Sequence, residues 1–297
     1  GLSRSLWDVG RSEAAIATIK EAIRRNPGNI SNYNVLSRQL AQMGRSGEAQ
    51  VWQEVALELD PESPAQRWGF CLGLLQLWAF EEATDCTREY LADFPGDPEA
   101  TNHLALLTGD VELGLANGRE QVERNPNFWY RKMQLADWLA AAGLAEELIE
   151  LFRNGFPTLY QEPPVVQPGN IWAARNLVRA YQQLEQYDRA NALIDAGLAH
   201  LEPQRKLQGT GLSSGTDDVD FLALRGDLDE AIARLREAID RDWQFYSFGL
   251  VFDSYFTPAL RAEPAFQAQV ERQRQLMAEQ YAWYVENRRG ADTLTQR

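Results

Sequence analysis

RNPGN at 25–29 returns as LDPES at 59–63, as FPGDP at 94–98 and as RNPNF at 124–128. The proline of each phrase keeps nearly the same interval, because Pro27, Pro61 and Pro95 stand 34 residues apart twice over and Pro126 follows after 31. A fixed period near 34 residues is typical of an array of helical hairpins, with one hairpin in each period. A single hairpin cannot bury its apolar face alone, so we expect successive hairpins to stack into one continuous core.

Each period reads as two amphipathic helices separated by a turn. In the second period, Tyr33, Leu36 and Leu40 recur at helical spacing and predict a first helix. Gly44 interrupts the pattern, as a residue just past a helix end does. A second apolar stripe, which includes Ala49, then runs to the proline that ends the period. The same turn is expected in later periods at Gly109, Gly143 and Gly226.

Two stretches interrupt the array. PTLYQEPPVVQPG at 157–169 holds four prolines and is interpreted as a loop insertion between repeats, with a hinge or a strap across one face as the alternative. PQRKLQGTGLSSGT at 203–216 is rich in Gly and Ser and predicts a flexible connector. Its GTGLSSG segment lacks the GK[ST] ending of a phosphate-binding loop. The repeats are therefore expected to fill residues 1–242 as about seven units, the first of them incomplete.

Residues 243–297 are expected to continue the array rather than to form a separate domain. They begin with an aromatic-rich connector, WQFYSFGLVFDSYF, and end in a long helix from about 264 to 289. One face of that helix is apolar and carries Phe266, Val270, Met277, Tyr281 and Tyr284. The opposite face is charged, so we predict that the helix caps the exposed end of the array.

The composition restricts the classes of partner. Lys and Arg number 29 against 43 Asp and Glu, which gives a net charge of −14. A surface this acidic repels phosphate groups, so we expect neither nucleic acid nor an anionic membrane surface as a partner of this segment. The chain holds no apolar run of the length that crosses a bilayer.

Catalysis is not expected from the residues present. The acidic pairs and clusters fall at predicted helix starts and turns, where the helix dipole favours negative charge. The two histidines, His103 and His200, are far apart, so neither a zinc site nor any other cofactor is predicted. Cys71 and Cys86 fall on successive helices of one repeat. They are interpreted as two small buried side chains, with a disulfide in an oxidising compartment as the alternative.

The recurring positions resemble the tetratricopeptide repeat. In one repeat the resemblance rests on an aromatic residue, small residues, a turn glycine and a closing proline, at Tyr33, Leu36, Ser37, Gly44, Ala49, Ala56 and Pro61. The resemblance implies an all-α fold, a right-handed superhelical solenoid of antiparallel helix pairs with a C-terminal capping helix. It implies little about function, because function in such arrays depends on the surface that each one presents.

A second resemblance covers residues 219–280. GDLDEAIARLREAIDRDW and the segment VFDSYFTPALRAEPAFQAQVERQRQLMAEQ are similar to the closing segments of repeat regions in bacterial winged-helix regulators and class III nucleotide cyclases. The first repeat has only the end of its first helix, around residues 2–7. Together these features predict that the chain is the C-terminal regulatory or sensing region of a larger bacterial signalling protein. Such regulators often place their repeats beyond a membrane span, so a periplasmic location is favoured over a cytoplasmic one.

The family resemblance also implies where a ligand binds, since the first helices of such arrays line a concave groove. The candidate peptide-binding residues in that register are Asn34, Arg38, Trp68, Leu72, His103, Met133, Asp137, Trp172, Arg175, Asn176, Arg179 and Gln183. The two tryptophans are equally interpreted as packing between repeats. The Lys and Asn pattern with which chaperone-binding relatives hold a terminal carboxylate is not reproduced.

These observations predict a non-catalytic scaffold that binds a protein or peptide in the concave groove. A free-standing adaptor in envelope assembly is the alternative, and an all-helical enzyme is the third reading. These features are also compatible with self-association of the chain.

Overall fold

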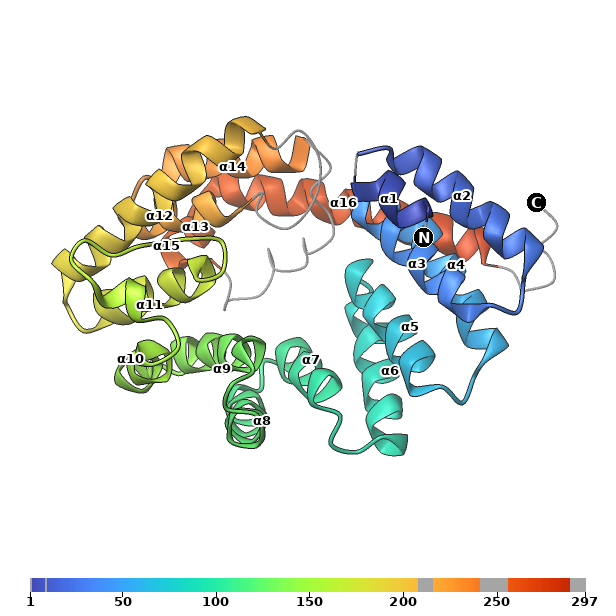
Figure 1. The fold of residues 1–297 in the computed structure, drawn as a ribbon, viewed down its shortest axis with the longest axis horizontal. Helices are drawn as coiled ribbons and strands as arrows, with labels where there is room; N and C mark the ends of the chain where they lie inside the picture. The colour runs from blue at the N-terminus through green and yellow to red at the C-terminus, as the bar shows by residue number, and fades with distance from the viewer. Residues whose placement is uncertain (1, 9, 208–215, 241–255, 289–297) are drawn as a thin grey trace.

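The computed structural model describes residues 2–8, 10–207, 216–240 and 256–288. Within these ranges the regular secondary structure is helical throughout, and Figure 1 shows its arrangement. In chain order the elements are α1 Leu2–Asp8, α2 Ser12–Arg25, α3 Ile30–Gln42, α4 Ser46–Leu59, α5 Pro64–Gln76, α6 Phe80–Asp93, α7 Pro98–Thr108, α8 Val111–Arg124, α9 Trp129–Ala141, α10 Ala145–Arg153, the 3-10 helix η1 Pro157–Tyr160, α11 Ile171–Gln183, α12 Tyr187–Leu207, α13 Asp217–Arg225, α14 Leu228–Asp240, α15 Pro258–Ala262 and α16 Pro264–Asn287.

Successive helices pair into hairpins, from α1 and α2 to α13 and α14, and each hairpin contacts the next. This arrangement confirms the predicted all-α solenoid. The predicted stripes are buried, because Tyr33, Leu36 and Leu40 are fully enclosed in a core shared by α2, α3 and α4. The hydroxyl of Tyr33 donates to the carbonyl of Pro27 at 2.8 Å, so the aromatic side chain ties the first helix to the preceding proline turn.

The turns between paired helices require a left-handed residue. Glycine occupies this position at the predicted turns, with φ of 73° at Gly44, 69° at Gly109, 72° at Gly143 and 95° at Gly226. Two hairpins place other residues there, with φ of 59° at Trp78 and 57° at Glu185. Positive φ strains the backbone of any residue that has a side chain. Trp78 and Glu185 therefore carry a strain that glycine would not have at the same positions.

The stretch 157–169 packs against the array as a loop insertion. Leu159 of η1 and Val166, which follows it, place their side chains in the core formed by α9 to α12. The Asn170 amide donates to the Thr158 hydroxyl at 3.1 Å and to the Val165 carbonyl at 3.0 Å. The Tyr160 hydroxyl donates to the Ile149 carbonyl at 2.7 Å. These contacts fix the insertion to its own hairpins and favour the loop over the hinge.

The second predicted break begins later than expected. Helix α12 continues through Pro203 to Leu207, so the prediction of a connector from residue 203 was wrong by about one turn. Proline removes only one helical donor, and near a helix end that loss is tolerated. The GTGLSSG segment lies outside the described residues, as does most of the aromatic-rich connector.

The final helix has the predicted apolar face. The side chains of Phe266, Val270, Met277 and Tyr284 are buried, as expected. The first half of α16 packs on the last hairpin, where Phe266 and Val270 share a core with α13 and α14, as a capping helix does. What the sequence did not predict is that the helix continues beyond this end and contacts α4, so that it runs from the last hairpins back to the first (Figure 1).

The two cysteines are bonded. Cys71 on α5 and Cys86 on α6 form a disulfide with their Cα atoms 5.5 Å apart, and the described residues include no free cysteine. The interpretation of two separate buried thiols was therefore wrong. Sequence supplies the distance along the chain but not the backbone geometry that a disulfide requires.

Candidate functional site

The twelve candidate residues all lie on the first helices of successive hairpins. They are distributed as Asn34 and Arg38 on α3, Trp68 and Leu72 on α5, His103 on α7, Met133 and Asp137 on α9, and Trp172, Arg175, Asn176, Arg179 and Gln183 on α11. The structure brings Asp137 together with four candidates on α11, which are Trp172, Arg175, Asn176 and Arg179. It also brings Trp68 and His103 into contact with each other.

A polar network joins α9 and α11 around Asp137. Its Oδ1 accepts hydrogen bonds from the Trp172 indole nitrogen at 3.2 Å and from the Asn176 amide at 3.0 Å. The same oxygen lies 3.9 Å from Nη2 of Arg175. Trp172 also lies beneath the Arg175 guanidinium, with 5.7 Å from Cζ to the ring centroid. Trp172 is therefore a packing residue between repeats, which was one of its two interpretations.

The network continues from α11 to α13 through Asp220. Nη1 of Arg175 donates to Oδ2 of Asp220 at 2.7 Å, and Nη2 of Arg179 lies 3.7 Å from Oδ1. The Asp220 side chain is 3% exposed and the Arg175 side chain 11% exposed. Both arginines thus face an internal carboxylate, and a ligand carboxylate would have to compete with it.

Burial dominates the electrostatics of this network. It raises the pKa of Asp137 even though Arg175 and a hydrogen bond from Asn176 oppose the shift. Burial likewise lowers the pKa of Arg179, against the attraction of Asp220. It raises the pKa of Asp217, at the start of α13, to about 6. Each shift disfavours the charged form, as expected where charges are removed from water.

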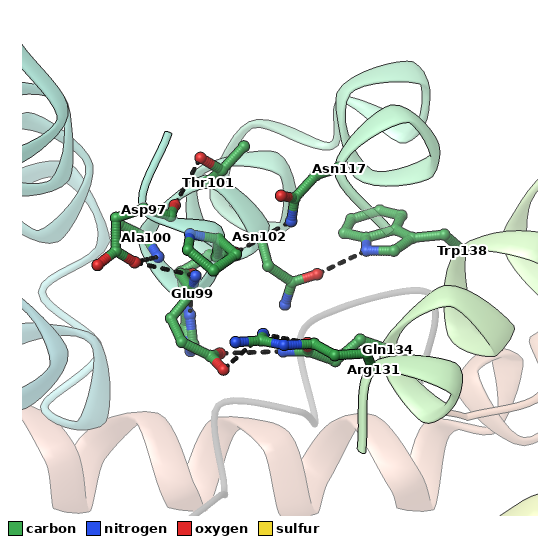
Figure 2. A network of polar contacts seen from close by, with 11 residues as sticks. Asp97, Glu99, Ala100, Thr101, Asn102, Asn117, Arg131, Gln134 and Trp138 are labelled. Atoms are coloured by element: carbon green, nitrogen blue, oxygen red, sulfur yellow. Dashed lines mark hydrogen bonds and ion pairs between the residues drawn. The ribbon is translucent and has the colours of Figure 1, made fainter. Parts of the chain in front are cut away.

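A second network, which sequence reasoning missed, joins α7 to α9 (Figure 2). Arg131 donates to Oε1 of Glu99 and to Oε1 of Gln134, each at 2.7 Å. The Gln134 amide donates to Oε2 of Glu99 at 3.0 Å. Beside them, the Trp138 indole donates to Oδ1 of Asn102 at 2.7 Å.

A signal for such networks is present in the sequence. The bonded pairs that join α7 to α9 lie 32 to 36 positions apart, as in Arg131 with Glu99 and Trp138 with Asn102. This separation is close to one period, so equivalent positions of neighbouring first helices meet. Polar residues that recur one period apart are therefore candidates for bonds between repeats.

Trp68 and His103 also pack between repeats. The Trp68 ring lies 5.1 Å from the His103 ring and 5.6 Å from the Tyr90 ring, measured between centroids. Nδ1 of His103 lies 2.8 Å from the Glu99 carbonyl oxygen, and burial lowers the pKa of the imidazole. His103 is therefore held as part of the joint between α5 and α7.

Met133 does not face a groove. Its side chain is 1% exposed and belongs to the core that spans α9 to α12, so its expected role as a ligand anchor is corrected. Helix α9 packs against both α8 and α11, which covers that side. Arg38 and Gln183 are exposed, although the Gln183 amide donates to the Gly143 carbonyl at 2.6 Å. Asn34 and Leu72 are partly buried.

A cluster of exposed aromatic side chains opens α9. Phe128 is 47% exposed and Trp129 53% exposed, and the adjoining Tyr130 is partly buried. The ring centroids of Phe128 and Tyr130 lie 6.1 Å apart. Cζ of Arg131 lies 5.9 Å from the Phe128 ring and 5.8 Å from the Tyr130 ring. We call Phe128, Trp129 and Tyr130 the aromatic patch. The aromatic patch has a signal in the sequence, which is its run of three consecutive aromatic residues. One apolar stripe of a helix cannot bury three neighbours in the sequence.

The described residues form neither a metal site nor a membrane span. In the described part of the chain, no group of three or more His, Cys, Asp or Glu side chains could hold a metal ion. None of the described helices combines the length and the hydrophobicity that crossing a bilayer requires. The buried charged groups face each other between repeats, where they fix neighbouring helices.

Residues 1–29 match the family model of the tetratricopeptide repeat. No curated protein matches the chain in sequence. Among solved structures, it is similar to a tetratricopeptide repeat protein from Parabacteroides merdae ATCC 43184, with 14% identity over 93% of this chain and 96% of that chain and a TM-score of 0.54. It is less similar to YrrB, a protein of the same repeat type with an unusual peptide-binding site, with 20% identity over 64% of this chain and 94% of that chain and a TM-score of 0.41.

A further similar structure is the P58(IPK) TPR domain, with 14% identity over 99% of this chain and 93% of that chain and a TM-score of 0.29. The family match indicates a tetratricopeptide repeat at residues 1–29, and the fold shared with the first structure is the helical solenoid. At these identities the likeness concerns the fold alone.

Proposed function

We propose that the protein is a non-catalytic scaffold that binds a protein or peptide partner along its first helices, with the aromatic patch as anchor. The observation that carries the proposal is the exposure of Phe128 and Trp129 beside each other on an otherwise acidic array. Large exposed aromatic side chains are enriched among the residues that dominate binding energy at interfaces. Isolated exposed hydrophobic residues need no explanation, but adjacent ones do.

The surroundings of the aromatic patch favour binding without rearrangement. Arg131, which lies against Phe128 and Tyr130, is held by Glu99 on the neighbouring repeat and by Gln134 on its own helix. A side chain that is already fixed loses little conformational freedom when a ligand arrives. The α7 to α9 network therefore supports a rigid anchor.

The charge of the chain favours a basic partner. The net charge is −14, and the candidate peptide-binding residues Arg175 and Arg179 already face carboxylates of the chain itself. Complementary charge speeds association and selects between partners. We therefore propose a ligand segment with an apolar or aromatic anchor next to Lys or Arg residues. Arg38 and the other exposed candidates remain proposed contacts on the same helices.

A peptide selection tests this proposal. Phage-displayed random peptides would be selected on the full chain, and the enriched peptides measured by calorimetry. We expect the double variant Phe128→Ala, Trp129→Ala to bind them at least 10-fold more weakly, because the anchor is removed. Tyr187→Ala is the matched control, since Tyr187 is 57% exposed on a second helix. Failure to enrich any peptide, or equal loss in both variants, would contradict the proposal.

We further propose that this scaffold is the regulatory or sensing region of a larger bacterial signalling protein. That context rests on the similarity of residues 219–280 to the closing segments of such repeat regions. The adaptor of envelope assembly is the alternative. Reading the gene around residue 1 separates them, because a winged-helix or cyclase domain supports the first and a short signal peptide alone supports the second.

A further inference from the structure

Helix α16 brings the two ends of the array together. Its first half belongs to the C-terminal core, where Phe266 and Val270 pack with residues of α13 and α14. Its second half leaves that core and contacts α4. The backbone N–H of Gly47 donates to Oε1 of Gln280 at 3.0 Å, although the two residues are 233 positions apart. The array is thereby closed into a ring (Figure 1).

The contact between α4 and α16 follows one face of each helix. Gly47 meets Gln280, Val51 meets Tyr284, and farther along Glu54 lies 3.6 Å from Nε of Arg288. The residue numbers rise together on both helices, so α4 and α16 run parallel here. The spacing of about one turn on each helix keeps the contacts on a single seam.

Glycine is needed at the start of this seam. A Cβ atom at Gly47 would collide with the backbone oxygen of Gln280 and would lie 3.2 Å from the carbonyl carbon and 3.3 Å from the Trp283 ring. Because the obstacle is backbone, no side-chain rotation relieves it. The absence of a side chain at Gly47 therefore permits α16 to approach.

Trp78 makes a second connection between the ends. It occupies the left-handed turn between α5 and α6, where five other hairpins have glycine. Its side chain packs against the C-terminal core that contains Phe266 and Val270. A residue held in a strained backbone conformation persists where its contacts compensate, so the strain indicates that this contact has a role.

The buried apolar cluster where α16 meets α4 is small. It consists of Val51, Leu77 and Tyr284, with Tyr281 partly buried beside them. The Tyr281 hydroxyl donates to Oε1 of Glu82 at 2.9 Å near the surface. Contacts between parts of one chain allow relative motion by default unless they are large and hydrophobic.

We propose that these residues form a clasp that opens and closes the ring while every hairpin stays folded. The clasp comprises Gly47, Val51, Leu77, Trp78, Gln280, Tyr281 and Tyr284. In the open form the second half of α16 leaves α4, and the array is free to change its curvature, which depends on small rotations between repeats. This inference concerns the shape of the array and holds whether or not the aromatic patch is the binding site.

Gly47→Ala tests the clasp in the full chain. Alanine is the better helix former, so α4 itself should not suffer. We expect small-angle X-ray scattering to show a larger radius of gyration than in the unchanged protein, with the same helical content by circular dichroism. Gly28→Ala is the control, since its nearest neighbouring atom lies 4.0 Å away, and it should leave both measurements unchanged. An unchanged radius in Gly47→Ala would overturn the proposal.

A second pair of variants decides the result if Gly47→Ala folds poorly. Trp78→Gly replaces a strained residue with the one found at the other turns, so the hairpin is retained while the contact with the C-terminal core is lost. Glu185→Gly makes the same backbone change at an exposed turn outside the clasp. Expansion in Trp78→Gly alone supports the clasp. Equal compactness in both variants, or loss of helix in Trp78→Gly, overturns it.

Discussion

The joint between α9, α11 and α13 and the seam between α4 and α16 connect helices in different ways. The first combines a large apolar core with paired charges around Asp137 and Asp220. The second rests on three fully buried hydrophobic side chains and a few polar contacts. We therefore expect neighbouring repeats to stay joined, whereas the proposed clasp joins the two ends of the array by a contact that separates.

Sequence separation explains part of this difference. Helices of adjacent repeats are brought together by the chain itself, so each contact orders only a short loop. Helix α16 meets α4 across 233 positions, and closing a longer loop costs more conformational entropy, although the cost rises slowly with length. The small apolar cluster of the seam matters more for its strength, because the stabilisation from burial scales with the apolar area removed from water.

The largest expected effect is at the joint between α11 and α13. Asp220→Ala removes the carboxylate that Arg175 and Arg179 face, and breaking a buried pair costs about 3–5 kcal/mol. We expect the midpoint of urea unfolding, followed by circular dichroism, to fall accordingly. Asp195→Ala serves as the control because Asp195 is exposed, and it should change stability by less than about 0.5 kcal/mol. Equal stability of the two variants would contradict a permanent charged joint.

The next effect concerns the disulfide of the hairpin that carries Trp78. Cys71 and Cys86 are separated by 15 positions, and a loop of that size implies a stabilisation of about 3 kcal/mol. Reduction should therefore lower the melting temperature and speed hydrogen exchange in α5 and α6, but not in α11. In a Cys71→Ala, Cys86→Ala variant the reducing agent should have no further effect.

Much of the array could be predicted from the sequence because its causes are local. The period, the buried stripe of Tyr33, Leu36 and Leu40 and the turn at Gly44 each depend on residues within one repeat. The assignment of first helices placed Asp137 and Arg175 on helices that do come together. The loop at 157–169 was predicted from its prolines alone.

The remainder depends on contacts between distant segments. The apolar face of α16 was predicted correctly. An apolar stripe does not say which helix will cover it, and the helix that covers the second half of α16 is α4 of the second hairpin. Met133 was misplaced because helices on both sides bury α9. No local pattern predicted that Trp78 forms a turn, because the predicted turns were all found from their glycines.

A smaller effect isolates the strain at the turns. Glu185→Gly removes an exposed side chain from a left-handed position, and relief of that strain should stabilise the fold by about 1 kcal/mol. Chemical denaturation measures the change. Trp78→Gly should gain the same relief but lose the contact across the ring, so its net gain should be smaller. A larger gain for Trp78→Gly would argue against a clasp.

The smallest effect is a pH dependence of the seam. Burial raises the pKa of Glu54, although the charge of Arg288 and the nearby Tyr284 hydroxyl oppose the shift and Glu58 reinforces it. The closed form therefore binds a proton more readily than the open form. Closure should be favoured below the ordinary glutamate pKa of 4.5 and should weaken as the pH rises from there through the raised pKa of Glu54. Scattering across this range measures it, and Glu54→Gln should abolish the dependence.

Native-state hydrogen exchange in the unchanged protein tests the central claim most directly. Amide exchange would be followed at increasing denaturant in the second half of α16 and in α11 within one sample. We predict that residues 280–287 exchange through an opening of lower free energy, while α11 exchanges only with global unfolding. Identical free energies of opening for the two helices would show that the ring is as permanent as the array, and would contradict the account.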